Sequence, residues 1–385
     1  MMSDDAGLRN RGRERSDVDE RRNAIERMTG AKLDHISSYS FDPVSAGKNI
    51  ENMIGAVQVP LGFAGPVKVN GEHAKGEFMI PLATTEGALV ASVSRGMSVI
   101  TSSGGANVKV FKDAMTRAPV FSVRGIDHAS DVILWIGKNE KRIKDAVNGT
   151  TSHGKLVDIE PFPNGRSLFL RFSYDTGDAM GMNMVTIATE AVCRLIEKET
   201  GAVLVSASGN MCTDKKPAWI NAIEGRGKSV IAEAVIPADI VKNKLHASVD
   251  SIIDVNTRKN LIGSSLAGSM GNNAHAANMA AALYIATGQD PAQVVEASLT
   301  MTTCESADGD LYISVRMPAV EVGTVGGGTR LPSQSEALNI MGCLGTGKAK
   351  KLAELVAVTV LAGELSTLGA QAAGHLGKAH KELGR

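Results

Sequence analysis

The chain has 385 residues, of which 43% are apolar and 21% are charged. This composition is ordinary for a water-soluble globular protein, and the length suggests two or three domains. Lys and Arg together number 41, as do Asp and Glu. The chain therefore has no net positive charge that would favour binding to nucleic acid or to an acidic membrane surface.

Apolar runs, cysteines and histidines exclude further classes of protein. No apolar run reaches the roughly 18 residues that a membrane-spanning helix needs, so we expect a cytoplasmic protein without a membrane. The four cysteines are widely separated and the eight histidines form no ligand-like cluster. We therefore expect neither a disulfide framework nor a metal site.

The first part of the chain predicts a helical segment followed by the start of a larger domain. Residues 1–47 are polar and predict short helices. Residues 48–117 combine short strands, broken by Pro and Gly, with a buried helix over 84–105. We assign 48–117 to the first part of a large mixed α/β domain.

The middle of the chain, 118–207, predicts a small domain of its own. Strand patterns lie at 118–125, 155–162, 167–174 and 202–208, and helix patterns at 127–147 and 178–201. The order β-α-β-β-α-β is that of a ferredoxin-like fold. The large domain resumes over 218–385, after a connection at 208–217. The sequence thus predicts an α+β protein with an inserted ferredoxin-like (βαββαβ) domain.

The connection reads "SGNMCTDKKPAW", residues 208–219, and places an acid and two lysines before a proline. Adjacent side chains of an extended segment point to different sides, and Pro217 favours extended backbone at Lys216. One lysine can then face a reacting oxygen while the other holds a substrate carboxylate. The alternative is a polar turn between two domains.

Other segments combine a chemical interpretation with a structural one. "GDAMGMNM" (177–184) and "GTVGGGT" (323–329) can offer backbone N–H groups to a phosphate or a nicotinamide, or can be an ordinary cap and turn. Glu86 lies near a helix start, where a carboxylate also offsets the helix dipole. Asp290 opens "DPAQ", which predicts an N-cap. His275 and Asn278 are three residues apart and share a helix face.

Six segments in a fixed order are more specific than any of them alone. They are "ENMIGAVQVPLGFAGP", "ATTEG", "GDAMGMNM", "SGNMCTDKKPAWINAIEGRGK", "NAHAAN" and "GTVGGGT". Over about residues 15–385 the chain resembles 3-hydroxy-3-methylglutaryl-CoA (HMG-CoA) reductase, class I, in its soluble archaeal-like form. The resemblance implies four-electron reduction of HMG-CoA to mevalonate and free CoA with two NADPH, the committed step of the mevalonate pathway to isoprenoids. It also implies a homodimer with shared active sites, or a tetramer.

The resemblance also assigns catalytic roles. Lys215 corresponds to the lysine that stabilises the oxyanion, and His380, on a mobile C-terminal tail, to the histidine that protonates the CoA thiolate. Glu86 corresponds to the acid that supplies protons to the carbonyl oxygen. Asp290 corresponds to the carboxylate that couples Glu86 to Lys215. A close pair of carboxylates would raise the pKa of Glu86 and keep it protonated near neutrality.

The remaining implied positions bind substrate or cofactor. The large domain is expected to bind HMG-CoA through Glu51, Arg95, Arg117, Ser208, Asn210, Asp214, Lys216, Lys259, His275 and Asn278. Asn278 is further expected to orient Lys215, and the Cys212–Thr213 peptide to be cis. The small domain is expected to bind NADPH, together with the 323–329 loop, through Ser152, His153, Asp178, Met180, Gly181, Met182, Asn183, Gly326, Gly327 and Gly328.

One departure from the family pattern bears on the cofactor. His153 aligns loosely with an arginine that often reads the NADPH 2′-phosphate, and a neutral imidazole is a weaker phosphate partner. NADH therefore remains a possible second cofactor. Two alternatives belong to other classes: a non-redox CoA-thioester lyase or acyltransferase, and a catalytically silent nucleotide- or CoA-binding regulator. The paired nucleotide-like segments argue against the first, and the four catalytic candidates together argue against the second.

Overall fold

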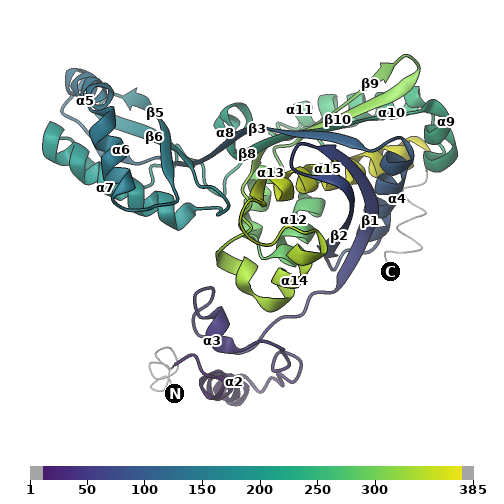
Figure 1. Ribbon diagram of the computed structural model, residues 1–385, viewed down its shortest axis with the longest axis horizontal. Helices are drawn as coiled ribbons and strands as arrows, with labels where there is room; N and C mark the ends of the chain where they lie inside the picture. The colour runs from purple at the N-terminus through teal and green to yellow at the C-terminus, as the bar shows by residue number, and fades with distance from the viewer. Residues whose placement is uncertain (1–11, 375–385) are drawn as a thin grey trace.

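Strand β3 (Ala106–Arg117) joins the two lobes of the protein, as Figure 1 shows. In this computed structural model, which describes residues 12–374, Asn107–Ala114 pair with β8 (Arg226–Ile236) in the larger lobe. The last three residues, Met115–Arg117, pair with β6 (Ser167–Asp175) in the smaller lobe. Both pairings are antiparallel. The described strands therefore form one continuous hydrogen-bonded sheet, in the order β7-β4-β6-β3-β8-β10-β9, with β1, β2 and β5 attached at its sides.

The larger lobe packs helices against a mainly antiparallel sheet. Its other strands are β1 (Leu61–Gly71), β2 (Lys75–Ala83), β9 (Met301–Ala307) and β10 (Asp310–Val320). Its helices are α4 (Leu89–Ser102), α8 (Trp219–Glu224), α9 (Ala238–Ile240), α10 (Val249–Val255), α11 (Ser264–Leu266), α12 (Ala276–Thr287), α13 (Val294–Ala297), α14 (Pro332–Ile340) and α15 (Ala349–Ala372). Two π-helical segments are η1 (Val241–Leu245) and η2 (Asn256–Gly263), and two 3₁₀ turns are η3 (Pro291–Gln293) and η4 (Gly327–Arg330).

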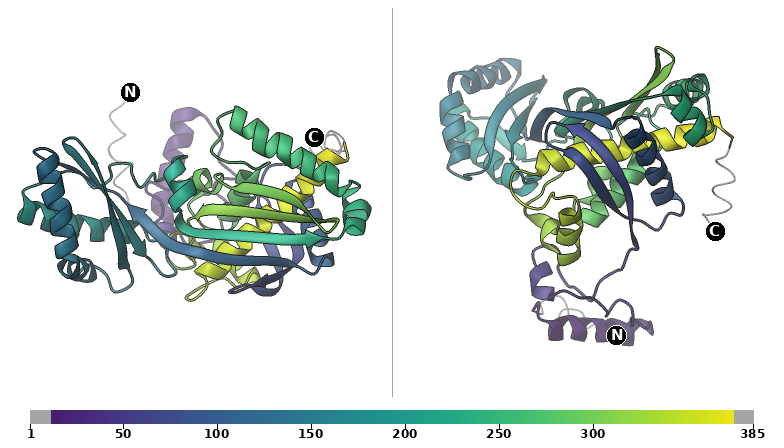
Figure 2. Two further views of the ribbon diagram at one scale, coloured as in Figure 1. Left: turned by 90° about the horizontal axis from the view of Figure 1, so that it is seen from above. Right: turned by 45° about the vertical axis from the view of Figure 1, so that its right-hand side comes forward.

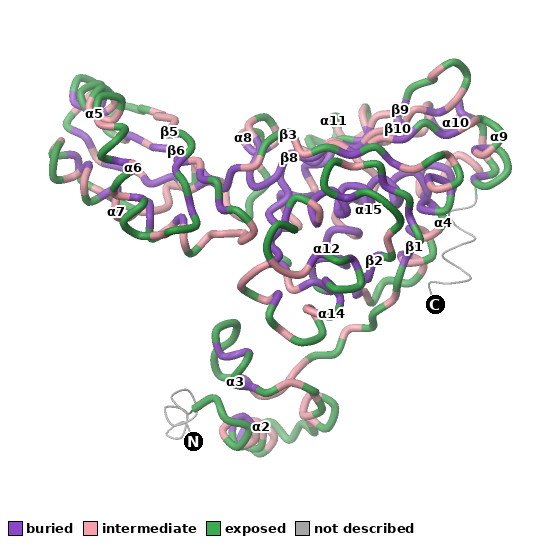
Figure 3. The backbone as a smooth tube through the Cα atoms, in the orientation of Figure 1, coloured by how far each residue is buried: buried purple, intermediate pink, exposed green. Residues whose placement is uncertain are grey.

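Helix α15 is the centre of the larger lobe (Figure 3). It is the one described helix that is long and apolar enough to cross a membrane, but 94% of its apolar window is buried inside the fold, as in a core helix. Gly363 does not interrupt the helix; a Cβ there would lie 2.5 Å from the Met279 sulfur. The small residue therefore allows α12 and α15 to pack closely.

The smaller lobe holds one end of this sheet and has a core of its own. Its other strands are β4 (Val120–Ser122), β5 (Lys155–Asn164) and β7 (Val203–Ser206), and the order across the sheet is β7-β4-β6-β5, all antiparallel. Three helices, α5 (Ile126–Lys138), α6 (Glu140–Asn148) and α7 (Met182–Thr200), pack with this sheet (Figure 2). Gly201 ends α7 in the left-handed region, at φ 71°, as the sequence predicted.

Two local expectations for this lobe were wrong. The helix expected over 127–147 is two helices, because Asn139 leaves helical backbone and its side chain donates to the Trp135 carbonyl at 2.9 Å. The helix expected from 178 begins only at Met182, because Gly181 at φ 89° precedes it as the N-cap.

The N-terminal segment forms two helices, α2 (Arg15–Thr29) and α3 (Pro43–Ala46), that stand away from the larger lobe (Figures 1 and 2). Val18, Ala46 and Met53 form a small core of their own. An extended strand-like connection then leads from this segment to β1.

Candidate active site

The connection at 208–217 has an unusual backbone. Asn210, Thr213 and Lys215 all have positive φ, at 64°, 48° and 57°. A positive φ at a non-glycine residue raises the free energy of the fold by about 1–3 kcal/mol, and it is kept only where neighbouring contacts hold the backbone. The extended backbone expected around Lys215 is therefore wrong at that residue. The Lys215 amide donates to Glu296 Oε1, and Asn221 Nδ2 donates to the Thr213 carbonyl at 3.2 Å.

The Cys212–Thr213 peptide is trans in this structure. Within residues 12–374, Gly65–Pro66 is the only cis peptide bond. The cis bond that the resemblance implied at Cys212–Thr213 is thus absent here.

Lys215 forms an ion pair with Asp290. Its Nζ lies 2.8 Å from Asp290 Oδ2, while Asp290 Oδ1 accepts from the Ala292 amide at 3.0 Å and caps η3. The predicted N-cap at Asp290 is confirmed, and the same carboxylate also holds the lysine. The hydrogen bond that Lys215 donates to Asp290 is the main reason that the pKa of Lys215 is raised, because it outweighs partial burial. The Lys215 side chain is 45% exposed, so a ligand can reach it.

Glu86 lies at the end of a chain of polar contacts. Asn278 Nδ2 is 3.2 Å from Glu86 Oε1 and 3.3 Å from His275 Nδ1. His275 Nε2 is 2.7 Å from Thr367 Oγ1, a pattern that fits a proton on Nε2. Within the described part of the chain, Asn278 thus contacts Glu86 and not Lys215. Glu86 and Asp290 likewise bond to different partners.

The other residues of the connection are held mainly by protein groups. Asp214 Oδ1 lies 3.1 Å from Arg226 Nη2, and its Oδ2 lies 3.8 Å from Arg117 Nη1. Lys216 Nζ is exposed and donates to the Asp214 carbonyl at 3.2 Å. Ser208 Oγ lies 3.7 Å from the Cys212 sulfur, and the Asn210 carbonyl accepts from the Thr213 amide at 2.9 Å.

Sequence reasoning missed a buried cluster beneath this connection. Arg226 is fully buried and bonds to Gln293, Glu296 and Glu321 at 3.1–3.3 Å. Burial raises the pKa of Glu296 to about 6 and that of Glu321 to about 8, although the nearby guanidinium opposes both shifts. A signal was present: each glutamate is a lone charge inside an apolar run, "VVEASL" and "PAVEV".

The two expected cofactor segments lie side by side. The Thr324 amide donates to the Asp178 carbonyl at 2.8 Å, and a Cβ on Gly323 would lie 2.5 Å from the Met180 nitrogen. Gly326 and Gly327 have positive φ, and no heavy atom of the described residues lies within 4 Å of a Cβ added to either. This leaves open space beside exposed backbone. Gly328 instead packs against the Gly288 carbonyl, 2.5 Å from an added Cβ.

Asp178 has a role that its local sequence does not reveal. Its carboxylate accepts from the amides of Gly347, Lys348 and Ala349 at 2.7–3.1 Å and so caps α15, about 170 residues later. Partial burial opposes ionisation, but these three hydrogen bonds prevail and lower the pKa of Asp178. In the same segment, Met182 and Asn183 form the first turn of α7, and the Met182 sulfur is 2.9 Å from Arg226 Nη2.

Ser152 and His153 lie in the exposed loop between α6 and β5. The His153 amide donates to Thr151 Oγ1 at 3.1 Å, and that hydroxyl contacts the Met184 sulfur at 3.1 Å. The loop is therefore anchored to the first turn of α7.

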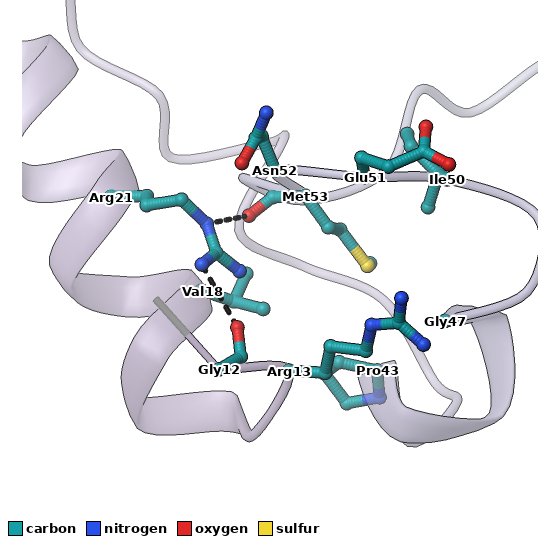
Figure 4. A pocket seen from close by; sticks show the side chains of 10 residues that line it. All are labelled: Gly12, Arg13, Val18, Arg21, Pro43, Gly47, Ile50, Glu51, Asn52 and Met53. Atoms are coloured by element: carbon teal, nitrogen blue, oxygen red, sulfur yellow. Dashed lines mark hydrogen bonds between the residues drawn. The ribbon is translucent and has the colours of Figure 1, made fainter. Parts of the chain in front are cut away.

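Three expected substrate residues lie on other elements, and one expected catalytic residue falls outside the described part of the chain. Arg95 in α4 donates to the Ser366 carbonyl at 2.8 Å, and burial lowers its pKa. Lys259 in η2 donates to Asn260 Oδ1 at 3.1 Å. Glu51 lines a cavity of about 130 Å³ in the N-terminal segment, where Arg21 donates to the Met53 carbonyl at 2.9 Å (Figure 4). His380 lies outside the described residues.

Comparison with known proteins identifies the family. Residues 17–385 match the family described as hydroxymethylglutaryl-coenzyme A reductase. The 3-hydroxy-3-methylglutaryl-coenzyme A reductase of Haloferax volcanii is 55% identical over 95% of this chain and 92% of its own length. That of Methanocaldococcus jannaschii is 56% identical with the same coverage. A Dictyostelium discoideum relative is 46% identical over 96% of this chain and 68% of its own length.

Solved structures agree on the fold. The class II 3-hydroxy-3-methylglutaryl-CoA reductase from Streptococcus pneumoniae bound to NADPH has a TM-score of 0.71 and 19% sequence identity, and the match covers 96% of this chain and all of that one. At this identity the likeness shows a shared fold. Together with the sequence matches along nearly the whole chain, it leads to one conclusion: the chain belongs to the hydroxymethylglutaryl-coenzyme A reductase family.

Proposed function

We propose that this protein is an NADPH-dependent HMG-CoA reductase, which reduces HMG-CoA to mevalonate and free CoA at the committed step of the mevalonate pathway to isoprenoids. The observation that carries this function is the ion pair of Lys215 with Asp290 in a chain of this family. It leaves a partly exposed, positively charged Nζ at the connection between the two lobes.

Lys215 stabilises the negative charge that develops on the substrate oxygen. When bound in turn, each of two NADPH molecules would supply one hydride to the carbonyl carbon of the substrate. Each addition converts a carbonyl oxygen into an oxyanion, first at the thioester and then at the aldehyde. A preorganised cation lowers the energy of such a transition state. Because Asp290 raises the pKa of Lys215, the lysine keeps its charge at neutral pH.

Two further groups handle protons. Glu86 delivers a proton to each oxyanion, and the Asn278 amide at 3.2 Å holds its carboxyl in place. Between the two reductions the hemithioacetal hydroxyl returns its proton to Glu86 as the C–S bond breaks, which gives mevaldehyde and a CoA thiolate. His380 donates the proton that converts the thiolate into free CoA.

The smaller lobe holds the cofactor in this account. Its strand order and antiparallel pairings support an inserted ferredoxin-like domain at 118–207. NADPH would lie between 178–183 and Gly326–Gly328, with its 2′-phosphate near Ser152 and His153. The open space at Gly326 and Gly327 fits this group, because backbone N–H groups can approach it without a side chain between them.

The larger lobe, from 48–117 and 218–385, binds HMG-CoA. Of the ten expected substrate residues, four belong to the connection itself: Ser208, Asn210, Asp214 and Lys216. Arg117 ends β3, and Arg95, Lys259, His275 and Asn278 lie on other elements of this lobe. Glu51 lies before β1 and lines a cavity with residues of the N-terminal segment, which stands away from the rest of its own chain (Figure 1). We therefore assign Glu51 to the active site of a second subunit, in a homodimer or tetramer. The enzyme would act in the cytoplasm.

A product analysis tests this function. The purified protein is incubated with HMG-CoA and NADPH, and mevalonate, free CoA and acetyl-CoA are separated by chromatography. We expect mevalonate and free CoA, formed only when NADPH is present. Acetyl-CoA formed without NADPH consumption would identify a lyase instead. Binding of both ligands without turnover would identify a regulator.

A further inference from the structure

The buried cluster beneath the connection joins four parts of the fold. Arg226 lies on β8, Glu296 on α13, Glu321 just after β10, and Asp214 in the connection itself. Arg226 Nη1 lies 3.3 Å from Glu296 Oε1 and 3.2 Å from Glu321 Oε1, while its Nη2 lies 3.1 Å from Asp214 Oδ1. The Arg226 guanidinium thus links residues 208–217 to the core of the larger lobe.

Glu296 contacts Lys215 directly. Its Oε1 accepts from the Lys215 backbone amide, and the same oxygen accepts from Arg226. Lys215 is therefore held at two points, by Glu296 at its amide and by Asp290 at its Nζ. Both acids belong to the short stretch formed by η3 and α13, so the two anchors of Lys215 move together.

The charges in the cluster favour this arrangement. Arg226 contacts three carboxyl groups, of which Glu296 and Glu321 are fully buried, and one guanidinium does not balance all three negative charges. Burial raises the pKa of Glu321 most, so Glu321 holds a proton at neutral pH. The guanidinium charge is then shared by Glu296 and Asp214. Oε2 of Glu296 and Oε2 of Glu321 have no hydrogen-bond partner among residues 12–374. The side-chain contacts of Glu296 described above are therefore all made by its Oε1.

We propose that Glu296, held by Arg226, is a positioning residue that fixes the left-handed backbone of Lys215 and thereby aims its Nζ at the substrate oxygen. This inference rests on the proposed function, in which Lys215 stabilises the oxyanion. Glu296 itself touches neither substrate nor cofactor. Its loss therefore lowers kcat and leaves the affinity for both ligands nearly unchanged.

The test compares Glu296→Met with Glu296→Gln. The amide oxygen of glutamine can still accept from the Lys215 amide, whereas methionine cannot. We expect Glu296→Met to lower kcat by about 10²-fold, the cost of a misplaced catalytic group, with the KM for HMG-CoA and NADPH changed by less than about 3-fold. Glu296→Gln should restore most of the lost kcat.

Hydrogen exchange provides a readout that does not depend on activity. The peptide covering 208–217 should exchange faster in Glu296→Met than in the wild type, and at nearly the wild-type rate in Glu296→Gln. If the wild type fails to oxidise NADPH, the proposed function fails, but this comparison still shows whether Glu296 holds the connection.

Glu354 in α15 provides the matched control. It is a buried glutamate that accepts from the amides of His73 at 3.0 Å and Ala74 at 2.6 Å, in a turn after β1. Glu354→Met should lower Tm but leave kcat within about 3-fold of the wild type. A Glu296→Met variant that behaves like this control would overturn the proposal.

Glu296→Asp covers the case in which Glu296→Met does not fold. The shorter side chain keeps its charge beside Arg226 but draws back from the Lys215 amide. We expect a folded protein with kcat lowered by about 10-fold or more and unchanged KM values. Wild-type kcat in folded Glu296→Asp, or an equal loss of kcat, ligand affinity and Tm, would contradict positioning.

Discussion

Asp290 binds Lys215 and caps a helix with the two oxygens of one carboxylate: Oδ2 lies 2.8 Å from Lys215 Nζ, and Oδ1 accepts from the Ala292 amide at 3.0 Å. The cap fixes the direction of the carboxylate, so the lysine meets an anion that is already oriented. In the proposed function, this pairing keeps Lys215 positively charged as a hydride reaches the substrate.

Replacing Asp290 with Asn should separate its two roles. The amide oxygen can still cap η3, but the charge that raises the pKa of Lys215 is lost. The pKa of Lys215 should then fall, and the alkaline limb of the kcat profile should move to lower pH. Steady-state kinetics across the pH range measures this, with Tm as the check on folding. An unchanged alkaline limb would show that this limb does not report Lys215.

The buried cluster should make stability depend on pH. A carboxyl group whose pKa is raised in the folded state binds its proton more tightly there than in the unfolded chain. Glu321, at about 8 against an ordinary 4.5, therefore stabilises the fold at low pH, and this contribution is lost as pH rises through about 8. Glu296, at about 6, acts in the same direction.

Glu321→Gln isolates that contribution, because glutamine is neutral at every pH. Between pH about 5 and 9, the free energy of unfolding of the wild type should fall by a few kcal/mol more than that of the variant. Urea unfolding at several pH values gives both curves. Parallel curves would mean that Glu321 does not titrate in this range.

His153 should set the choice between the two nicotinamide cofactors. We expect NADPH to be preferred over NADH, and His153→Arg to increase that preference, because a guanidinium pairs with a phosphate bidentately. The ratio of kcat/KM for NADPH and NADH is compared in both proteins. An unchanged ratio would show that residue 153 does not face the 2′-phosphate.

His380 should matter for one of the two reductions only. HMG-CoA reduction releases a thiolate that needs a proton, whereas mevaldehyde reduction has no such leaving group. His380→Gln should therefore slow HMG-CoA turnover by about 10²–10⁴-fold and largely spare mevaldehyde. Equal losses on both substrates would remove the thiol-protonation role.

Local sequence patterns predicted the features that depend on neighbouring residues. The N-cap at Asp290 and the glycine that ends α7 follow from chemistry within a few positions, and the structure confirms both. The strand and helix patterns of 118–207 likewise match the order of the observed elements, apart from the break at Asn139 and the later start of α7 at Met182. These features need no information about distant parts of the chain.

Features that depend on distant residues were not predictable in the same way. The local sequence predicts that Asp178 caps the helix that follows it, but its carboxylate caps α15. Pro217 predicts extended backbone only at Lys216, whereas the left-handed backbone of Lys215 accompanies a contact of its amide with the distant Glu296. Arg226 gives no sign of burial in "EGRGK", because its three acidic partners come from separate elements.

The most direct test of the account is the ratio of NADPH oxidised to CoA released from HMG-CoA, measured in the wild type and in Lys215→Ala. We predict two NADPH oxidised per CoA released in the wild type. In Lys215→Ala the rate should fall by at least about 10²–10³-fold on both HMG-CoA and mevaldehyde, while HMG-CoA still binds. A ratio of zero in the wild type, or similar turnover by the wild type and Lys215→Ala, would contradict the account.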